Sequence, residues 1–142
     1  MLQKISVKIK LLNSNAKIPT YGNEYSAGFD IYSSEDSIIY PRETKMICTG
    51  ISVEIPEGKV CFIWDRSGMG SKGIHKFAGV IDSDYRGEYN IILHNLTSKP
   101  FKIKKGDRIA QGVIQDHYQA EFIESELSET QRGTGSFGST GI

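Results

Sequence analysis

The sequence predicts an all-β sandwich or barrel, and three observations lead to this prediction. Short apolar or alternating runs recur about every eight to twelve residues, with turns rich in glycine, proline, asparagine and aspartate between them. Nowhere do apolar residues recur at helical spacing over about three turns. At 142 residues and 38% hydrophobic content, the chain can form one hydrophobic core, so we expect a single domain.

The predicted strands of the first half begin with a clear alternation. Ile5, Val7, Ile9 and Leu11 alternate with lysines and a serine, as expected of a half-buried strand. The run from Val60 to Trp64 is apolar throughout, which is typical of a strand buried on both faces. Between these segments we expect short strands at 29–32, 38–40, 44–48 and 51–55.

The second half begins with a loop and then a predicted β-hairpin. Residues 66–76 hold three glycines and little periodicity, which predicts a loop with about one helical turn. Apolar runs at 80–81 and 91–93 flank a polar stretch, which predicts a hairpin whose loop opens at Asp82 and closes at Gly87. After it we expect strands at 101–103 and 108–114, and a glycine-, serine- and threonine-rich tail at 132–141.

Composition and charge exclude several classes of function. Seventeen Lys and Arg balance 17 Asp and Glu, and no basic cluster predicts a long nucleic-acid footprint, so we expect no nucleic-acid partner. Cys48 and Cys61 lie in apolar runs without a CxxC pair, which predicts two reduced core thiols. Residues 1–8 mix charged and aliphatic residues, so we expect neither a secretion signal nor a membrane contact. The expected location is the cytoplasm, or the nucleus for a eukaryotic or viral protein.

The predicted hairpin loop carries more chemistry than a chain reversal needs. Asp82, Asp84, Tyr85 and Arg86 place two carboxylates, a phenol and a guanidinium within five positions, whereas Asn-Gly or Asp-Gly would suffice for a turn. In one interpretation, a buried Asp82 is a general base whose surroundings set its pKa. In the other, Asp82 caps the loop by accepting backbone N–H bonds and Asp84 pairs with Arg86 at the surface.

The tail has a composition that suits a phosphate clamp. Arg132 supplies charge, Phe137 supplies an aromatic face, and hydroxyls and glycines expose donors that can approach an anion closely. A glycine-rich segment gives up much backbone freedom on ordering, so such a clamp would order only on binding. The alternative is an ordinary disordered terminus.

Three further positions are weaker candidates. Arg66-Ser67-Gly68 follows a buried strand and suits an anionic oxygen, although this tripeptide is common. Asp30, inside a short strand, could be a buried hydrogen-bonding carboxylate or part of a metal site. Residues 106–108 predict a turn whose aspartate bonds its own backbone, and the role of Gln111 stays open. No histidine metal site is expected, because no shared ligand spacing connects His75, His94 and His117.

These candidates occur together and in one order, and that order resembles the trimeric dUTP pyrophosphatases (dUTPases). The resemblance spans nearly the whole chain, and its third and fifth motifs are the most specific. The five motifs are AGFD (27–30), RSG (66–68), GVIDSDYRGE (79–88), GDRIAQ (106–111) and RGTGSFGSTG (132–141).

The resemblance implies a fold, an assembly and an activity. The fold would be a jelly-roll-like β-barrel domain over 1–131, assembled as a homotrimer. A flexible tail over 132–142 would close over an active site built from all three chains. The implied activity is hydrolysis of dUTP to dUMP and pyrophosphate with Mg²⁺, which limits uracil incorporation into DNA and supplies dUMP for thymidylate synthesis.

The resemblance also assigns roles to individual residues. Asp82 would activate the water that attacks the α-phosphorus, and Asp30 would bind Mg²⁺ through water. Tyr85 would lie against the deoxyribose and exclude a 2′-hydroxyl, and Phe137 would stack on uracil. The other implied substrate contacts are main-chain groups at Gly79 and Ile81, and phosphate contacts at Arg66, Ser67, Gly68, Gln111, Arg132, Gly138, Ser139 and Thr140.

Three positions depart from the family pattern, and two rival functions stay open. Asp65 stands where the family usually has proline, and beside Arg66 it could orient or weaken that arginine. Ser136 replaces a usual glycine, and Lys76 lies near a position where many relatives have asparagine. A dCTP deaminase-related enzyme would need a glutamate that shuttles protons at the 4-position of the pyrimidine. A non-catalytic trimeric binding protein would lack Asp82 or the tail.

Overall fold

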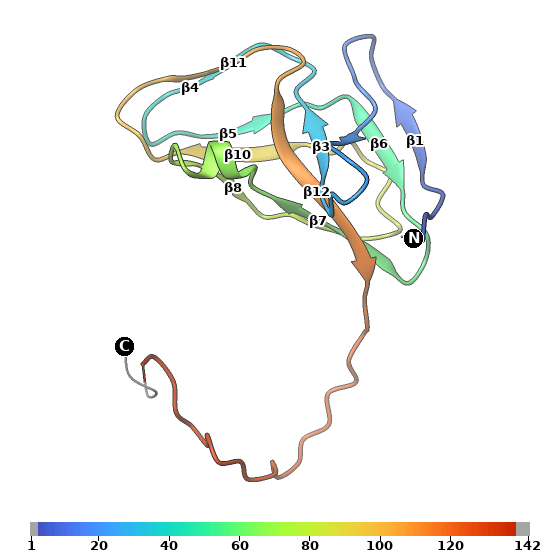
Figure 1. Cartoon of the computed structure of the whole chain (residues 1–142), viewed down its shortest axis with the longest axis vertical. Coiled ribbons are helices and arrows are strands. Elements are labelled where there is room, and N and C mark those ends of the chain that lie inside the picture. The colour runs from blue at the N-terminus through green and yellow to red at the C-terminus, as the bar shows by residue number, and fades with distance from the viewer. Residues whose placement is uncertain (1–2, 139–142) are drawn as a thin grey trace.

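The computed structural model describes residues 3–138, and β-strands carry nearly all of its regular structure (Figure 1). This confirms the all-β prediction. One short helix, α1 (Ser67–Gly70), provides the expected helical turn, and no helix in the described part of the chain is long and apolar enough to cross a membrane. The strands are β1 (Lys8–Leu11), β2 (Thr20–Tyr21), β3 (Phe29–Tyr32), β4 (Ser37–Ile39), β5 (Thr44–Ile47), β6 (Ile51–Glu54), β7 (Lys59–Trp64), β8 (Ile74–Phe77), β9 (Val80–Ile81), β10 (Ile91–Asn95), β11 (Phe101–Ile103) and β12 (Arg108–Asp116).

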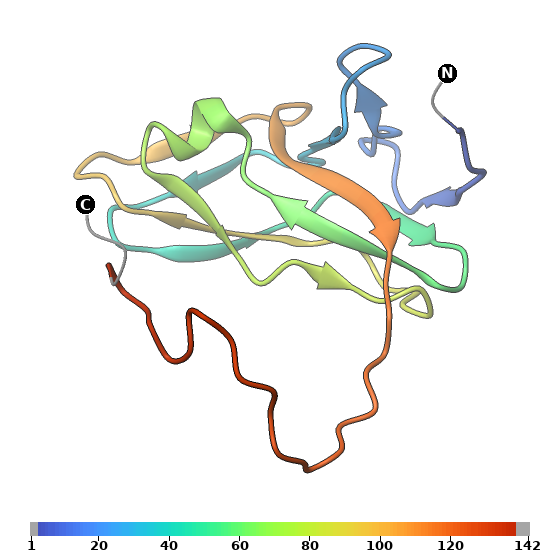
Figure 2. The same ribbon diagram turned by 60° about the horizontal axis from the view of Figure 1, so that its bottom comes forward.

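The strands form four antiparallel sheets. The largest has five strands in the order β2-β3-β12-β7-β9, and the second has three in the order β5-β10-β8. The pairs β1-β6 and β11-β4 complete the fold, and the sheets lie over one another in two views (Figures 1 and 2). Strand pairing does not join the four sheets into one closed barrel within residues 3–138; loop hydrogen bonds such as Tyr89 N–H to Ile51 O and a shared core connect them.

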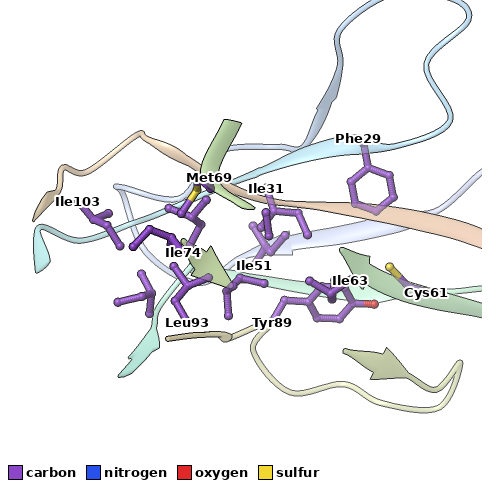
Figure 3. Close-up of a cluster of buried hydrophobic side chains, with 14 of the residues drawn as sticks. Phe29, Ile31, Ile51, Cys61, Ile63, Met69, Ile74, Tyr89, Leu93 and Ile103 are labelled. Carbon is purple, nitrogen blue, oxygen red and sulfur yellow. The ribbon is translucent and has the colours of Figure 1, made fainter. Parts of the chain in front are cut away.

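One hydrophobic core fills the space between the sheets. Figure 3 shows Ile31, Ile51, Ile74, Leu93 and Tyr89 packed together, and each is at most 1% exposed. The core forms because the strands alternate, so that every second side chain points inward.

The same alternation aims functional side chains outward. Burial of Phe29 and Ile31 turns Asp30, between them on β3, to the other face of the sheet. Gln111 on β12 pairs with Asp30 on one side and with Trp64 of β7 on the other. Directly opposed residues share a face, so these three side chains lie in one row across the sheet.

Two sequence predictions about strands hold only in part. The first strand was predicted over residues 5–11, but only β1 forms there. Within β1, Ile9 is half-buried and Leu11 is exposed. The strand β7 buries Val60, Cys61 and Ile63, but Trp64 at its end is 54% exposed. Both cysteines are free: Cys61 lies in the core as predicted, whereas Cys48 is only partly buried.

The predicted hairpin is wrong, because β9 and β10 belong to different sheets. The strand β9 pairs with β7, whereas β10 pairs with β5 and β8. The intervening loop is anchored to the start of β6: Gly50 N–H donates to Glu88 Oε1 at 2.7 Å, and Tyr89 N–H donates to Ile51 O at 2.8 Å. These bonds carry the chain away from β9 before β10 begins.

The chain beyond β12 leaves the body as an extended arm (Figures 1 and 2). Residues 117–138 contain neither helix nor strand, and apolar side chains on the arm such as Tyr118, Phe122 and Leu127 are almost fully exposed. The last strand therefore ends at Asp116. The predicted domain boundary at 131/132 lies within the arm and stays a prediction.

Candidate active site

A groove opens between β9 and β10, where the hairpin was expected. Its volume is about 280 Å³, and we call it the β9 groove. Residues 79–82 form one wall, apolar side chains from β5, β7, β8 and β10 contribute to the others, and residues of the 85–90 loop complete the lining. The lining residues used below are Gly79, Val80, Ile81, Asp82, Tyr85, Glu88 and Tyr89.

The open edge of β9 provides main-chain groups along this groove. One edge pairs with β7, at Cys61↔Ile81 and Phe62↔Val80, and no other strand within residues 3–138 pairs with β9. Ahead of the strand, Ile63 N–H donates to Gly79 O at 2.8 Å. The remaining N–H and C=O groups can therefore bind a flat ligand as they would bind another strand.

Gly79 cannot be replaced by a larger residue without a change in the groove wall. Its φ of +126° is a conformation that side chains disfavour. In addition, a methyl group there would lie 2.9 Å from the Ile63 carbonyl oxygen. The first residue of the third motif is thus fixed by sterics.

Asp82 lies exposed in the groove wall with an unengaged carboxylate. Its side chain makes no hydrogen bond or ion pair with any residue of 3–138; only its main-chain carbonyl accepts a bond, from Tyr85 N–H at 3.2 Å. The capping interpretation is therefore wrong, and so is the expectation that Asp82 is buried. The predicted Asp84–Arg86 pair is also absent, because Arg86 Nη1 donates to Ser83 O at 2.6 Å. The free Asp82 oxygens can accept a proton from bound water.

Tyr85 is folded back over its own loop. Its hydroxyl donates to Glu88 O at 3.0 Å, and a methyl group at Gly87 would lie 2.3 Å from the hydroxyl oxygen. Its ring also stacks on Tyr89, with 6.3 Å between centroids. These contacts hold the aromatic face in the groove wall, close in sequence to the free carboxylate.

A second cluster gathers charged groups on the five-stranded sheet. Asp30 Oδ1 lies 3.0 Å from Arg66 Nε, and Oδ2 lies 3.4 Å from Arg108 Nη1. Arg66 Nη1 also donates to Arg108 O at 3.3 Å. The carboxylate orients two guanidinium groups that keep further N–H donors for an anion. Arg108 was not predicted to bind an anion, because the sequence pattern placed it in the turn at 106–108; it begins β12, the strand that carries Gln111.

Gln111 is held in the same region. Its Nε2 donates to Asp65 O at 2.7 Å, and its Oε1 lies so close to Gly28 that a methyl group there would be 2.3 Å away. This close approach explains the glycine of the first motif. The second N–H of the amide remains for a ligand.

The Asp65 carboxylate faces β8, so the expectation that it acts directly on Arg66 is wrong. Lys76 N–H donates to Asp65 Oδ1 at 2.7 Å, and His75 Nδ1 lies 2.5 Å from Oδ2. Arg66 instead pairs with Asp30. The contacts of Asp65 could not be read from its position beside the arginine.

Of the described residues, no three His, Cys, Asp or Glu side chains form a metal cage. Asp30 is the carboxylate of the second cluster, and both its oxygens are shared with arginines. Mg²⁺ retains several waters, so one carboxylate that accepts hydrogen bonds from those waters fits this ion without a cage.

Within one chain, residues 132–138 of the tail make no hydrogen bond or ion pair with either cluster. Arg132 Nε donates to Gly135 O at 2.8 Å, and Phe137 is fully exposed at a φ of +47°. Ser136 has no positive φ, consistent with the loss of glycine there. Ser139 and Thr140 lie outside the described residues, so their predicted contacts stay predictions.

The open edge of β9, the free Asp82 carboxylate beside it and the arginine cluster are the features of an all-β protein that can bind a flat, anionic ligand. The dUTPase family model matches residues 14–141. The chain belongs to the dUTPase family.

Curated relatives and solved structures agree with this assignment. The deoxyuridine 5'-triphosphate nucleotidohydrolase of Nautilia profundicola is 50% identical over 141 residues, 96% of this chain and 99% of the relative. That of Helicobacter pylori strain J99 is 44% identical and covers 97% of this chain and 98% of the relative. The Staphylococcus bacteriophage 80alpha dUTPase with dUPNHPP has a TM-score of 0.91 at 31% identity, over 98% of this chain and 100% of that chain.

A further solved structure concerns a metal. The D95N dUTPase from phage phi11 of S. aureus has a TM-score of 0.82 at 28% identity and covers 89% of this chain and 100% of that chain. It is described with a coordinated structural Mg(II) ion. The agreement in fold confirms the predicted jelly-roll-like architecture.

Proposed function

We propose that this protein is a homotrimeric dUTP diphosphatase that hydrolyses dUTP to dUMP and pyrophosphate with Mg²⁺. The observation that carries the proposal is the free Asp82 carboxylate beside the open main-chain edge of β9 in one groove. The family assignment supports the substrate. In a cell the reaction limits uracil incorporation into DNA and supplies dUMP for thymidylate synthesis.

Uracil recognition would use the main chain of the β9 groove. Uracil presents acceptor, donor and acceptor along one edge, which unpaired main-chain N–H and C=O groups along residues 79–82 would complement. The carbonyl of Gly79 is not one of these groups, because it accepts from Ile63 N–H. Cytosine reverses two of these uracil positions and would leave polar groups unpaired, which would weaken binding by about 1–3 kcal/mol for each group. Tyr85, held by Glu88, would lie against the deoxyribose and exclude a 2′-hydroxyl.

Asp82 would act as the general base. It takes a proton from a water that attacks the α-phosphorus in line, while pyrophosphate leaves from the opposite side. Reactions of this type depend mainly on positioning and charge stabilisation, and a placed base adds roughly 10²–10⁴-fold. The absence of a side-chain partner for Asp82 within residues 3–138 supports this role, because the oxygen lone pairs stay free for water.

The second cluster would hold the phosphates. Arg66, Ser67 and Gly68 offer guanidinium, hydroxyl and main-chain donors at the start of α1, and Gln111 adds an amide N–H. Bound Mg²⁺ would neutralise charge on the triphosphate. Asp30 would orient the water shell of this ion, since its carboxylate lies between the same arginines.

Assembly would bring the separated parts together. None of Asp30, Arg66 and Gln111 lines the β9 groove of the same chain, so a complete site needs a neighbouring subunit. The arm exposes apolar side chains that a neighbour could cover, which supports a tail from another chain as the closing element. Its proposed ligand contacts are Arg132, Phe137, Gly138, Ser139 and Thr140.

Proton release measured on addition of dUTP and Mg²⁺ tests the function. We expect release with dUTP, and release at least about 100-fold slower with dCTP, dTTP or UTP, since each leaves groups unpaired or clashes. Ammonia release from dCTP would instead support the deaminase alternative. Tight dUTP binding without turnover would support a binding protein. Sedimentation analysis of the same sample tests the trimer.

A further inference from the structure

Asp65 connects three segments at the junction between β7 and α1. Its Oδ1 accepts from Lys76 N–H at 2.7 Å, and its Oδ2 lies 2.5 Å from His75 Nδ1, so the carboxylate binds β8 twice. Its main-chain carbonyl accepts from Gln111 Nε2 at 2.7 Å, which connects the same residue to β12. The side chain is 25% exposed, so these contacts are partly shielded from water.

One side of this junction leads to the phosphate cluster. Arg66 follows Asp65 directly and is oriented by Asp30. Gln111 is oriented by the Asp65 carbonyl and by its close contact with Gly28. A shift of the Asp65 main chain would therefore move Arg66 and release the Gln111 amide together.

The other side leads to the β9 groove. Lys76, whose N–H is bound by Asp65, donates from Nζ to Ala78 O at 2.8 Å, and its ammonium lies 5.2 Å from the centroid of the Trp64 ring. Ala78 has a φ of +59°, which is unfavourable for a residue with a Cβ. The Lys76 contact stabilises this turn, and the turn sets where Gly79 begins the groove wall.

We infer that Asp65 is a positioning residue that clamps β8 to the β7–α1 junction and thereby holds both the phosphate cluster and the start of the β9 groove of its own chain in place. The inference rests on the proposed function and deepens it. It assigns a role to a residue that departs from the family pattern and touches no reacting atom. The role requires two acceptor oxygens, since the Lys76 amide and the His75 ring each use one.

The test compares Asp65→Asn, His75→Gln and the double variant by dUTP kinetics and by calorimetric binding of dUMP. An asparagine keeps the shape but has one acceptor oxygen, so it cannot serve both donors. For Asp65→Asn we expect a loss in kcat/KM of about 10-fold and weaker dUMP binding by about 5-fold, as for one lost hydrogen bond of this kind. The double variant should be no worse than Asp65→Asn, because both changes break one clamp.

A matched control is Asp116→Asn. Asp116 pairs with Lys59 at 2.5 Å at the far end of β12, so this change also removes one carboxylate from an ion pair. We expect unchanged kinetics for it. If Asp65 were merely structural, Asp65→Asn would lower the melting temperature yet keep the kinetics of the folded protein, and this result would overturn the inference.

Two further outcomes are distinguishable. Losses that multiply in the double variant would show that His75 and Asp65 act separately and would overturn the clamp. A wild-type protein that neither hydrolyses dUTP nor binds dUMP would overturn the proposed function, and this inference with it. An active wild type with an unaltered Asp65→Asn variant would overturn the inference alone.

Discussion

Arg66 and Asp30 form an ion pair, 3.0 Å from Nε to Oδ1, that spans the central strand of the largest sheet. Asp30 lies on β3 and Arg66 follows β7, with β12 between them. Arg108 of β12 completes the arrangement at 3.4 Å. The carboxylate thus sets the direction of both guanidinium groups of the cluster.

Asp30→Asn should raise the Mg²⁺ concentration needed for half-maximal activity by about 10-fold, because the neutral amide holds the metal's waters less strongly. It should also lower the free energy of unfolding by about 1–3 kcal/mol, since the partly shielded Arg66 and the exposed Arg108 lose their counter-charge. Magnesium titrations of initial rate and urea denaturation measure the two effects. An unchanged magnesium requirement would contradict the proposed role of Asp30.

Asp82→Asn should reduce kcat by at least about 10²-fold, because the amide cannot accept the proton of the attacking water. The binding of dUpNHpp, a dUTP analogue that is not turned over, should stay within about 3-fold, since the Asp82 side chain makes no hydrogen bond or ion pair within residues 3–138 and its main-chain bond to Tyr85 is kept in the variant. Single-turnover rates and calorimetry separate the two. Normal turnover with lost binding would refute the assignment.

Gly79→Ala should weaken dUMP binding by at least about 10-fold and destabilise the protein by about 1–3 kcal/mol, because the methyl group meets the Ile63 carbonyl at a strained φ. Gly58→Ala is the matched control. It also has a positive φ, of +78°, but open space around it, so only the backbone strain should appear. Equal losses of dUMP binding in both variants would contradict the proposal that Gly79 shapes a dUMP-binding groove.

Removal of residues 132–142 should leave a folded trimer whose activity is at least about 10-fold lower, because the proposed ligand contacts of the tail are lost. The fold should remain, because every strand lies before residue 117. Circular dichroism and sedimentation check the fold and assembly, and initial rates with dUTP check the activity. Full activity of the shortened chain would eliminate the proposed clamp.

Alkaline pH should destabilise the protein through Cys61. Burial raises the pKa of this thiol from 9.0 to about 12, so the unfolded chain loses the proton first. Stability from this group is complete below pH 9 and is lost as the pH rises towards 12, at up to about 1.4 kcal/mol per pH unit. Urea denaturation between about pH 8 and about pH 10.5 should show that the free energy of unfolding declines less steeply for Cys61→Ala than for the wild type. Equal slopes would contradict the expectation.

The partial failure of the hairpin prediction shows where local patterns stop being informative. The runs at 80–81 and 91–93 are strands as predicted, because apolar β-branched residues bounded by turn residues favour that structure. Their pairing depends instead on Glu88 and Tyr89, which bond the start of β6 and divert the chain. No feature within the loop itself indicates that anchor.

Strand periodicity and the order of the five motifs can be read along the chain, and they were enough to predict the all-β class and the family. The pairing of β9 with β7, the ion pair of Arg66 with Asp30 rather than Asp65, and the bonds from Asp65 to β8 follow only from the folded structure. Asp30 and Arg66 are 36 positions apart. Contacts over such separations depend on strand order and register, which emerge only when the sheets pack around a common core.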